Sequence, residues 1–304
     1  MRDNIVILGV FVADAAYRAE RLPRMGETLL GSSFALGPGG KGSNQAVAAA
    51  RAGGRAHFIT RLGRDAFADM ALSVWAEAGV IPEIERSDDP TGSAFIFVEE
   101  ASGDNAIIVC PGAARGISAA DVDSRADIIA GAAAFMTQLE QPIEVAFRAL
   151  EIARQGGATT ILNPAPAASL PDGMLSLCDY ATPNESEAEA LTGIPVTSID
   201  DARRAAGALM DAGVGAAAIT LGENGTLFRD SRGEAHVPAM RAGPVVETTG
   251  AGDAFNGGFA VALAEGADPV DAARFGCAAA AISVTRPGTA PSMPSRAEID
   301  ALLG

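Results

Sequence analysis

Short apolar runs alternate with amphipathic stretches along most of the chain. Residues 4–12 form an almost unbroken apolar run, which is typical of a strand buried on both faces of a sheet, and Asp14 lies just beyond it. The runs at 159–162 and 216–220 predict further strands, whereas residues 66–78 are predicted as a helix. This alternation indicates an α/β fold with a parallel sheet between two layers of helices.

A second set of strands lies outside this alternation. Thr91–Val98 and Asn105–Val109 predict a hairpin with Gly103 in its turn. Together with strand-like pieces nearer the N-terminus, they indicate a small sheet whose strands come from about residues 12–38 and 91–110. Such a sheet could cover a site as a lid or pair with a second chain.

The composition narrows the classes of function. A chain of 304 residues that is 48% hydrophobic and 20% charged is ordinary for a soluble globular enzyme, and we expect one α/β domain over residues 1–304. The formal charge of −16 argues against a nucleic-acid partner or an anionic membrane surface. No apolar run reaches membrane length and the N-terminus lacks a leader pattern, so we expect a cytoplasmic protein. Cys110, Cys178 and Cys277 have no metal-ligand spacing and fit reduced buried thiols.

A glycine-rich stretch near residue 250 carries the strongest chemical signal. Gly250, Ala251 and Gly252 precede Asp253, and apolar residues then recur at helical spacing. The stretch is expected to form a loop that opens a helix, where free amides and the positive helix end bind a phosphate-like anion. Asp253, in the first turn, could take a proton from an attacking hydroxyl. The alternative is a strand-to-helix turn in which Asp253 is only a first-turn acid.

A second glycine-rich stretch covers residues 37–42 and precedes a small-residue helix predicted at Ala46–Ala52. Its glycines match the Gly-x-Gly-x-x-Gly pattern of dinucleotide sites, but that fingerprint should follow the first buried strand. The P-loop pattern is absent, because Lys41, the only lysine of the chain, is not followed by Ser or Thr. With Asn44, the turn could approach a polyhydroxy ligand closely; the alternative is a tight strand-to-helix turn.

Polar residues follow several predicted strands, at the edge where α/β sheets place ligand contacts. Asp14 and Glu140 are two such carboxylates; the alternatives are a turn residue and a solvated loop charge. Asn184 and Glu187 lie one turn apart at the start of a predicted helix, which they could cap, or they could hold a hydrated divalent ion. Backbone is exposed at the same edge at Thr220, Gly222 and Gly225.

Two of these motifs, in this order, resemble the signatures of a known family. The first is Gly39–Ala46 and the second is Glu247–Asp253. The resemblance runs nearly end to end and extends to Asn163–Ala167, Thr182–Glu185 and Arg286–Gly288 with Pro291 and Ser292. On this combination, the chain resembles the ribokinase-like (PfkB) family of carbohydrate kinases.

The resemblance implies a fold and a reaction. The fold is a three-layer α/β/α domain with a mainly parallel central sheet and a small β-sheet lid, often in a homodimer joined through the lids. The reaction is ATP-dependent phosphorylation of a sugar hydroxymethyl group, D-ribose to D-ribose 5-phosphate in the members that look most similar. Mg²⁺ and an activating potassium ion accompany ATP.

The resemblance also implies roles for matching positions. Asp253 would be the general base, with the amides of Gly250, Ala251 and Gly252 as the anion hole. The sugar would be held by Asp14, Gly40, Lys41, Gly42, Asn44, Glu140 and Asp253. The ATP site would be lined by Asn184, Thr220, Gly222, Gly225, Gly252 and Cys277. Glu187 would act on Mg²⁺ through water. Potassium would bind, mainly through backbone oxygens, at Glu247, Thr249, Ser283, Arg286, Gly288 and Ser292.

Two positions depart from the family pattern. Val12 stands where the family usually carries Asn, two residues before the sugar-binding Asp14. Glu247 is one methylene longer than the Asp that usually begins the cation loop, which leaves potassium activation open. Because polar contacts set selectivity among sugars, Val12 keeps open a kinase for another sugar or a nucleoside. A catalytically silent sugar- or nucleotide-binding regulator and a dinucleotide-dependent oxidoreductase are the alternatives from other classes.

Overall fold

A nine-stranded sheet forms the middle of the molecule, whose computed structural model describes residues 3–304. The strand order is β13-β12-β11-β10-β9-β8-β1-β4-β5, and neighbours are parallel except that β12 is antiparallel to both of its neighbours. The strands are β1 (Asn4–Leu8), β4 (Arg55–Leu62), β5 (Ile81–Arg86), β8 (Ala134–Thr137), β9 (Thr159–Leu162), β10 (Tyr180–Ala181), β11 (Ala216–Thr220), β12 (Thr226–Asp230) and β13 (Gly233–Val237). The predicted mainly parallel central sheet is confirmed.

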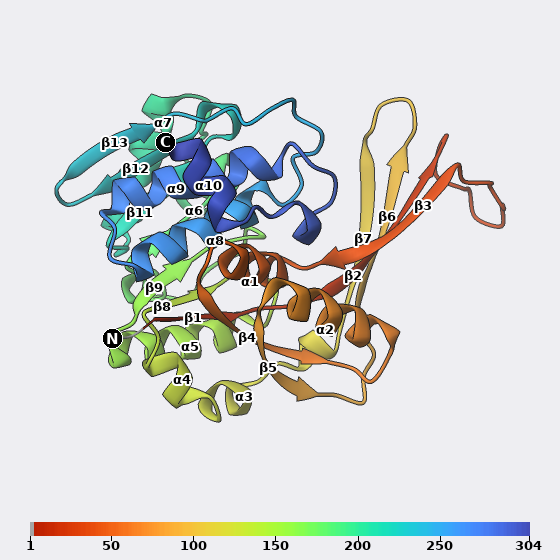
Figure 1. Cartoon of the computed structure of the whole chain (residues 1–304), viewed down its shortest axis with the longest axis horizontal. Helices are drawn as coiled ribbons and strands as arrows, with labels where there is room; N and C mark the ends of the chain where they lie inside the picture. The colour runs from red at the N-terminus through yellow and green to blue at the C-terminus, as the bar shows by residue number, and fades with distance from the viewer. Residues whose placement is uncertain (1–2) are drawn as a thin grey trace.

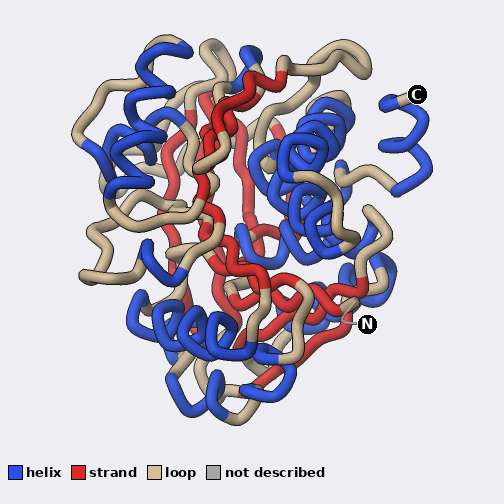
Figure 2. Tube along the Cα trace, turned by 90° about the vertical axis from the view of Figure 1, so that its left-hand side faces the viewer, coloured by secondary structure: helices blue, strands red, loops and turns tan. Residues whose placement is uncertain are grey.

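Helices cover both faces of this sheet, as Figure 2 shows, and the predicted three-layer arrangement is confirmed. One layer consists of α1 (Lys41–Arg51), α2 (Ala66–Ala78), α8 (Ala251–Ala264), α9 (Pro269–Ser283) and α10 (Arg296–Leu303). The other consists of α3 (Ala119–Asp123), α4 (Ala126–Ala130), α5 (Ile143–Gly156), α6 (Glu185–Thr192) and α7 (Ile199–Asp211). Short 3-10 helices are η1 (Ala113–Gly116), η2 (Leu175–Leu177), η3 (Gly222–Asn224) and η4 (Ala290–Ser292). In β1, Ile5 and Ile7 belong to the first core and Val6 and Leu8 to the second, because successive side chains of a strand point to opposite faces.

Four more strands form a separate mixed sheet, called the lid sheet below, that projects from the body (Figure 1). In spatial order they are β3 (Ser33–Gly39), β2 (Val12–Ala19), β6 (Thr91–Glu99) and β7 (Asn105–Gly112). β2 pairs with β6 in parallel, and the other two pairs are antiparallel. The predicted hairpin is therefore present, and Gly103 in its turn has a φ of 77°.

The first apolar run is divided, so the prediction of one strand over residues 4–12 is wrong. β1 ends before Gly9, and β2 begins at Val12 in the lid sheet. Gly9 lies so close to α1 that a Cβ there would be 2.7 Å from the Cα of Gly42. The chain leaves the central sheet at this contact, and Asp14 therefore lies inside a lid strand rather than just past a core strand.

Two helices begin earlier than predicted. α1 starts at Lys41 rather than Ala46, because Gly40 adopts a φ of 87° and is its N-cap. α8 starts at Ala251, so only Gly250 of that glycine-rich stretch precedes the helix. Residues of both motifs therefore lie in first helical turns, where backbone amides have no intrahelical partner.

Several other sequence predictions hold. α2, β9 and β11 have the predicted bounds. Cys178 and Cys277 are buried, but the prediction is wrong for Cys110, which is exposed. Cys110 lies on β7, an edge strand of the lid sheet, and so belongs to neither core. Within residues 3–304, no helix has both the length and the apolar character needed to cross a membrane.

Candidate active site

One pocket collects residues from both glycine-rich motifs at the carboxyl ends of the central strands. Its cavity volume is about 150 Å³. It is lined by Lys41, Asn163, Ala165, Thr182, Asn184, Glu187, Thr220, Gly250, Gly252, Asp253 and Asn256. Most of these are residues that the sequence predicted for the site. The structure thus brings together motifs that are about two hundred residues apart in the chain.

The N-terminus of α8 opens into this pocket. Gly250, its N-cap, has a left-handed φ of 84°, a conformation that favours glycine. A Cβ on Gly252 would meet no atom within 4 Å, so space remains beside the first turn. Gly250 and Gly252 line the pocket, whereas Ala251 does not, and its N–H donates to the carbonyl oxygen of Thr248 at 3.1 Å. The positive end of the helix dipole favours a phosphate group at such a place.

Asp253, in the first turn of α8, is the central carboxylate of the pocket. It is 7% exposed. Its Oδ2 accepts from Nδ2 of Asn44 and its Oδ1 from Nε2 of Gln45, each at 3.0 Å. Burial raises the pKa of Asp253, whereas the charge of Lys41 and the two amide donors lower it, and the net direction is upward. The two amides fix the orientation of the carboxylate, which general-base chemistry requires.

Lys41 is the only cation among the pocket-lining residues and the only lysine of the chain. Burial lowers its pKa, but the neighbouring carboxylates of Asp253, Glu140 and Glu187 raise it, and the net direction is upward. The ammonium therefore stays charged at neutral pH. A fixed positive charge beside an open helix N-terminus is suited to a phosphoryl group.

Other residues predicted to hold the sugar meet beside Lys41. The backbone N–H of Lys41 donates to Oε2 of Glu140 at 2.8 Å. The carboxylate of Asp14 lies against Gly39, where a Cβ would be 2.1 Å from Oδ2 of Asp14. A Cβ on Gly40 would lie 2.5 Å from a main-chain carbonyl oxygen. Glycine at these two positions therefore lets the lid sheet and α1 converge on the pocket.

Burial perturbs both of these sugar-side carboxyl groups. It raises the pKa of Asp14 to about 6. It also raises the pKa of Glu140 to about 7, against the lowering effect of Lys41 and with smaller upward contributions from Asp253 and Asp14. Neither residue lines the pocket itself, and because both pKa values lie near neutral pH, the charge beside the pocket depends on pH.

Three of the residues predicted for ATP line the pocket: Asn184, Thr220 and Gly252. Asn184 forms a parallel β-bridge with Thr220, which joins the end of β11 to the start of α6. The N–H of Thr220 donates to the carbonyl oxygen of Pro183 at 2.9 Å. These bonds hold polar groups of two neighbouring strand ends at one edge of the pocket.

The other three predicted ATP residues do not line the pocket. Gly222 and Gly225 have φ values of 52° and 88° and form the turn after β11. Cys277 is buried on α9, with its Sγ 3.3 Å from Oγ1 of Thr226. They shape the turn and the helix beside β11 and β12.

Glu187 caps α6, which is one of the two roles that the sequence left open. Asn184 and Glu187 form a capping box: Oδ1 of Asn184 accepts from the N–H of Glu187, and Oε2 of Glu187 accepts from the N–H of Asn184, each at 2.9 Å. The carboxylate also lines the pocket, and burial raises its pKa. No group of three or more His, Cys, Asp or Glu within residues 3–304 could hold a metal by itself. One carboxylate beside a phosphate site fits Mg²⁺, which keeps most of its water and binds largely through phosphates.

The segments predicted to hold potassium lie side by side. The N–H of Val246 donates to the carbonyl oxygen of Val284 at 2.8 Å, and the N–H of Gly288 donates to Oε2 of Glu247 at 2.7 Å. Arg286 forms an ion pair with Glu298 of α10. The remaining predicted members are Thr249, Ser283 and Ser292. The hydroxyl and carbonyl oxygens of these segments are the kind of ligand that a hard cation requires.

Sequence analysis missed a set of buried amides next to Asp253. Nε2 of Gln45 donates to both Asp253 and Oδ1 of Asn163, and Nδ2 of Asn163 donates to the carbonyl oxygen of Thr182. Asn256 accepts from Oγ1 of Thr182 and donates to the carbonyl oxygen of Gly252. The one available signal was amide residues inside otherwise small or apolar segments, which need buried partners.

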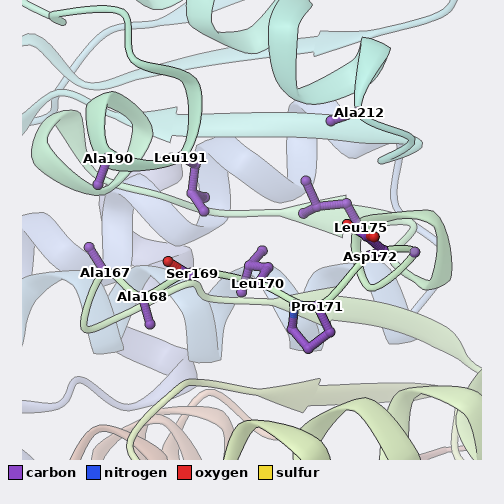
Figure 3. Close-up of a pocket in the computed structure, with 11 residues that line it drawn as sticks. Ala167, Ala168, Ser169, Leu170, Pro171, Asp172, Leu175, Ala190, Leu191 and Ala212 are labelled. Carbon is purple, nitrogen blue, oxygen red and sulfur yellow. The ribbon is translucent and has the colours of Figure 1, made fainter.

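A second, larger cavity lies away from these residues and holds none of the predicted site residues. Its volume is about 560 Å³. Figure 3 shows its lining by the segment 167–175 and by Ala190, Leu191 and Ala212. Asp172 is its one charged residue, and the cavity has no cationic side chain that could receive a phosphoryl group. The smaller pocket, which contains Lys41 and Asp253, is therefore the candidate active site.

Comparisons with known proteins agree with this geometry. The model of the family described as pfkB family carbohydrate kinase matches residues 2–296. A ribokinase of Haemophilus influenzae is 40% identical over 300 residues, which cover 98% of this chain and 97% of that protein. A deoxyribokinase of Salmonella typhi is 37% identical over 295 residues, with 96% of each chain covered. The structure of Arabidopsis thaliana ribokinase complexed with ribose and ATP superposes with a TM-score of 0.93 at 30% identity, covering 100% of this chain and 99% of that one.

We expect Glu140→Gln to stabilise the protein above neutral pH. The carboxyl of Glu140 titrates at about 7 in the folded chain and at 4.5 when unfolded, so the free energy of unfolding of the wild type should fall as pH rises through this window. Glutamine does not titrate and can still accept from the N–H of Lys41. The variant should therefore be on the order of 2–3 kcal/mol more stable than the wild type at about pH 8.

Urea denaturation at several pH values between about 5 and 8 measures this difference. Glu144→Gln, on an exposed position of α5, is the matched control and should follow the wild-type pH dependence. Equal stabilities of the wild type and Glu140→Gln at about pH 8 would contradict the expectation.

Proposed function

The chain belongs to the pfkB family of carbohydrate kinases, and we propose that within it the protein is a ribokinase. In this proposal it transfers the γ-phosphoryl group of ATP to the 5-hydroxymethyl group of D-ribose. The observation that carries the proposal is a buried carboxylate, Asp253, held by two amides beside the open N-terminus of α8. Ribose is favoured because the similar relatives include ribokinases, one of which has a structure that contains ribose and ATP.

In the proposed reaction, Asp253 is the general base. Its carboxylate takes the proton of the sugar hydroxyl as that oxygen attacks the γ-phosphorus, and the bond from phosphorus to the departing ADP oxygen breaks. The amides of Gly250, Ala251 and Gly252 stabilise the negative charge on the transferring group. The ammonium of Lys41 adds the one side-chain charge of opposite sign in the pocket. Asp253 then releases its proton to solvent with the product.

The sugar would lie between the lid sheet and α1. The carboxylates of Asp14 and Glu140 accept hydrogen bonds from hydroxyl groups, which suits a polyhydroxy ligand. Oδ1 of Asn44 is buried without a partner among the described residues, and it is an acceptor for a further hydroxyl. Gly40, Lys41 and Gly42 present backbone of the first turn of α1 on the same side.

ATP would occupy the side of the pocket formed by the ends of β10 and β11. The residues proposed to line its site are Asn184, Thr220, Gly222, Gly225, Gly252 and Cys277. Glu187 would hold Mg²⁺ through water. When bound, Mg²⁺ neutralises phosphate charge and orients the γ-phosphoryl group for transfer.

Potassium binding is part of the proposal. The proposed ligands are oxygens at Glu247, Thr249, Ser283, Arg286, Gly288 and Ser292. Because the segment 246–249 runs directly into the N-cap of α8, an ion here would fix the turn that presents the amides of the anion hole. Residues 1–304 are proposed to act as one domain with its lid, in the cytoplasm.

We propose that the lid sheet joins two copies of the chain. One face of it carries exposed apolar side chains in direct register across the strands: Tyr17, Phe34, Leu36, Phe95 and Ile108. The rings of Tyr17 and Phe34 lie 4.8 Å apart between centroids. A contiguous exposed apolar patch on a β-sheet with open edges is typical of an interface between chains.

A second candidate substrate is 2-deoxyribose, and Val12 favours it. Val12 is buried at the start of β2 and lies on the same face of the strand as Asp14. An apolar side chain at this place offers no hydrogen bond to a hydroxyl, so a sugar that lacks one hydroxyl loses less affinity. A deoxyribokinase is nearly as similar to this chain as the Haemophilus ribokinase.

A coupled assay of ADP release tests the function directly, with Mg-ATP and ribose, deoxyribose, fructose or adenosine, with and without K⁺. We expect turnover with ribose.

In the same assay, we expect Val12→Asn to raise the ribose-to-deoxyribose ratio of kcat/KM by roughly tenfold, because one hydrogen bond to the sugar is worth about that factor. Val196→Asn, which places the same amide at a buried position between α6 and α7, should leave the ratio unchanged. A preference for deoxyribose in the wild type would replace the ribose assignment and keep the mechanism.

Asp253→Ala should lower kcat by roughly 10²- to 10⁴-fold, because the variant has no base for the attacking hydroxyl. ATP binding, measured by calorimetry, should remain within a few-fold of the wild type. Asp172→Ala, which removes an exposed carboxylate in the second cavity, is the control and should keep full activity. Equal loss of ATP binding and turnover in Asp253→Ala would mean that Asp253 is structural.

The pair of substitutions Phe95→Lys and Ile108→Lys should separate the proposed dimer into single chains. Two positive charges on directly paired residues of the apolar face would be desolvated in the interface. Light scattering should give the mass of two chains for the wild type and of one chain for the variant. Met25→Lys, at a fully exposed position outside the lid strands, should remain dimeric. A single-chain mass for the wild type would refute the dimer.

A further inference from the structure

We propose that Gln45 is the positioning residue for Asp253, because buried hydrogen bonds on the other sides of its amide fix its NH₂ group as a donor to that carboxylate. This inference rests on the proposed function, in which Asp253 is the general base. Gln45 is 0% exposed and is not among the pocket-lining residues. It therefore acts through Asp253 rather than on a substrate.

A main-chain carbonyl group determines which amide atoms donate and which accept in these hydrogen bonds. The carbonyl oxygen of Thr182 can only accept, so its partner on Asn163, at 3.0 Å, must be the amide nitrogen Nδ2. The oxygen of the same amide then faces Gln45, whose Nε2 lies 3.0 Å away and must donate. The second hydrogen of that NH₂ group serves Oδ1 of Asp253, also at 3.0 Å.

The oxygen of the Gln45 amide supports the same assignment of its donor and acceptor atoms. Its Oε1 accepts from Nε2 of Gln138, which is also fully buried. Turning the Gln45 amide over would place Oε1 against the oxygens of Asn163 and Asp253, and both hydrogen bonds would be lost inside the protein. Leaving buried polar groups unpaired destabilises the folded chain, so one orientation of the amide is selected.

This fixed donor opposes the forces that would protonate a buried base. Burial raises the pKa of Asp253, and the charge of Asp253 in turn raises the pKa of Glu140, after β8, and of Glu187, on α6. The ammonium of Lys41 and the amides of Asn44 and Gln45 favour the ionised form. Of these three residues, only Gln45 is held by further side-chain hydrogen bonds, which run through Asn163 to the main-chain carbonyl oxygen of Thr182. It can hold the carboxylate in one orientation while substrates enter and leave.

The test compares two substitutions that each remove one buried amide. Gln45→Met keeps a side chain of similar length but cannot donate to Asp253. Gln141→Met is the control, because Gln141 is 3% exposed and its Nε2 donates to Oγ1 of Thr137 and to the main-chain carbonyl oxygen of Gln138, with no bond to Asp253 or to Gln45. The measurement is kcat and KM as a function of pH in the ADP-release assay.

We expect the acid limb of the kcat profile to move upward by about one pH unit in Gln45→Met, because loss of a donor raises the pKa of the base. kcat at neutral pH should fall roughly tenfold, with the KM for the sugar within about threefold of the wild type. Gln141→Met should keep the wild-type profile even where its thermal stability falls. An unmoved acid limb in Gln45→Met overturns the proposal, and so does an equal shift in Gln141→Met.

A second variant decides the question where Gln45→Met does not fold. Gln45→Glu keeps the shape but sets a second carboxyl against Asp253, so the acid limb should move further upward, and an unmoved limb overturns the proposal. Absence of turnover on every sugar, or full activity of Asp253→Ala, would remove the proposed function itself. Turnover that depends on Asp253 but not on Gln45 removes this inference alone.

Discussion

The close packing of α1 against α8 is the constraint on which the candidate site depends. A Cβ on Gly257 would be 2.4 Å from the Cβ of Ala48 and 2.9 Å from the carbonyl oxygen of Gln45, so a larger residue would force the helices apart. Gly257 lies one helical turn after Asp253, on the same face of α8. The glycine contact therefore brings Asp253 within hydrogen-bond distance of the amides of α1. The interface between α1 and α8 thus provides both the helix packing and the hydrogen bonds that orient Asp253.

The electrostatics of the pocket follow from burial in a strongly acidic protein. The chain has a formal charge of −16 and a single lysine, which lies in the pocket. Burial raises the pKa of four carboxyl groups around it, those of Asp14, Glu140, Glu187 and Asp253. The helix N-terminus and Lys41 are thus the local positive elements that could receive a phosphoryl group. Fixed dipoles and charges of this kind act strongly where water is excluded.

The lid sheet is joined to the pocket at two places. β2 follows β1 after only a short turn at Gly9, so the strand that carries Asp14 starts beside α1. On the other side, Oγ1 of Thr289 donates to the carbonyl oxygen of Pro38 in β3 at 2.8 Å. Thr289 also packs against Gly250, where a Cβ would be 3.3 Å from its Cα and Cβ. The lid, the loop before α10 and the N-cap of α8 therefore form one connected structure.

The sequence by itself determined the local elements and the two glycine motifs, because periodicity and glycine conformation depend on neighbouring residues. α2 and β9 have the predicted bounds, and Asp253 lies in a first helical turn as predicted. Only the tertiary structure decided that residues 4–12 divide between two sheets, because the break is set by the contact of Gly9 with α1. It also decided the bond from Gln45 to Asp253, which spans 208 residues, and the raised pKa of Glu140. Both depend on which groups pack around a side chain, and that is a property of the folded chain alone.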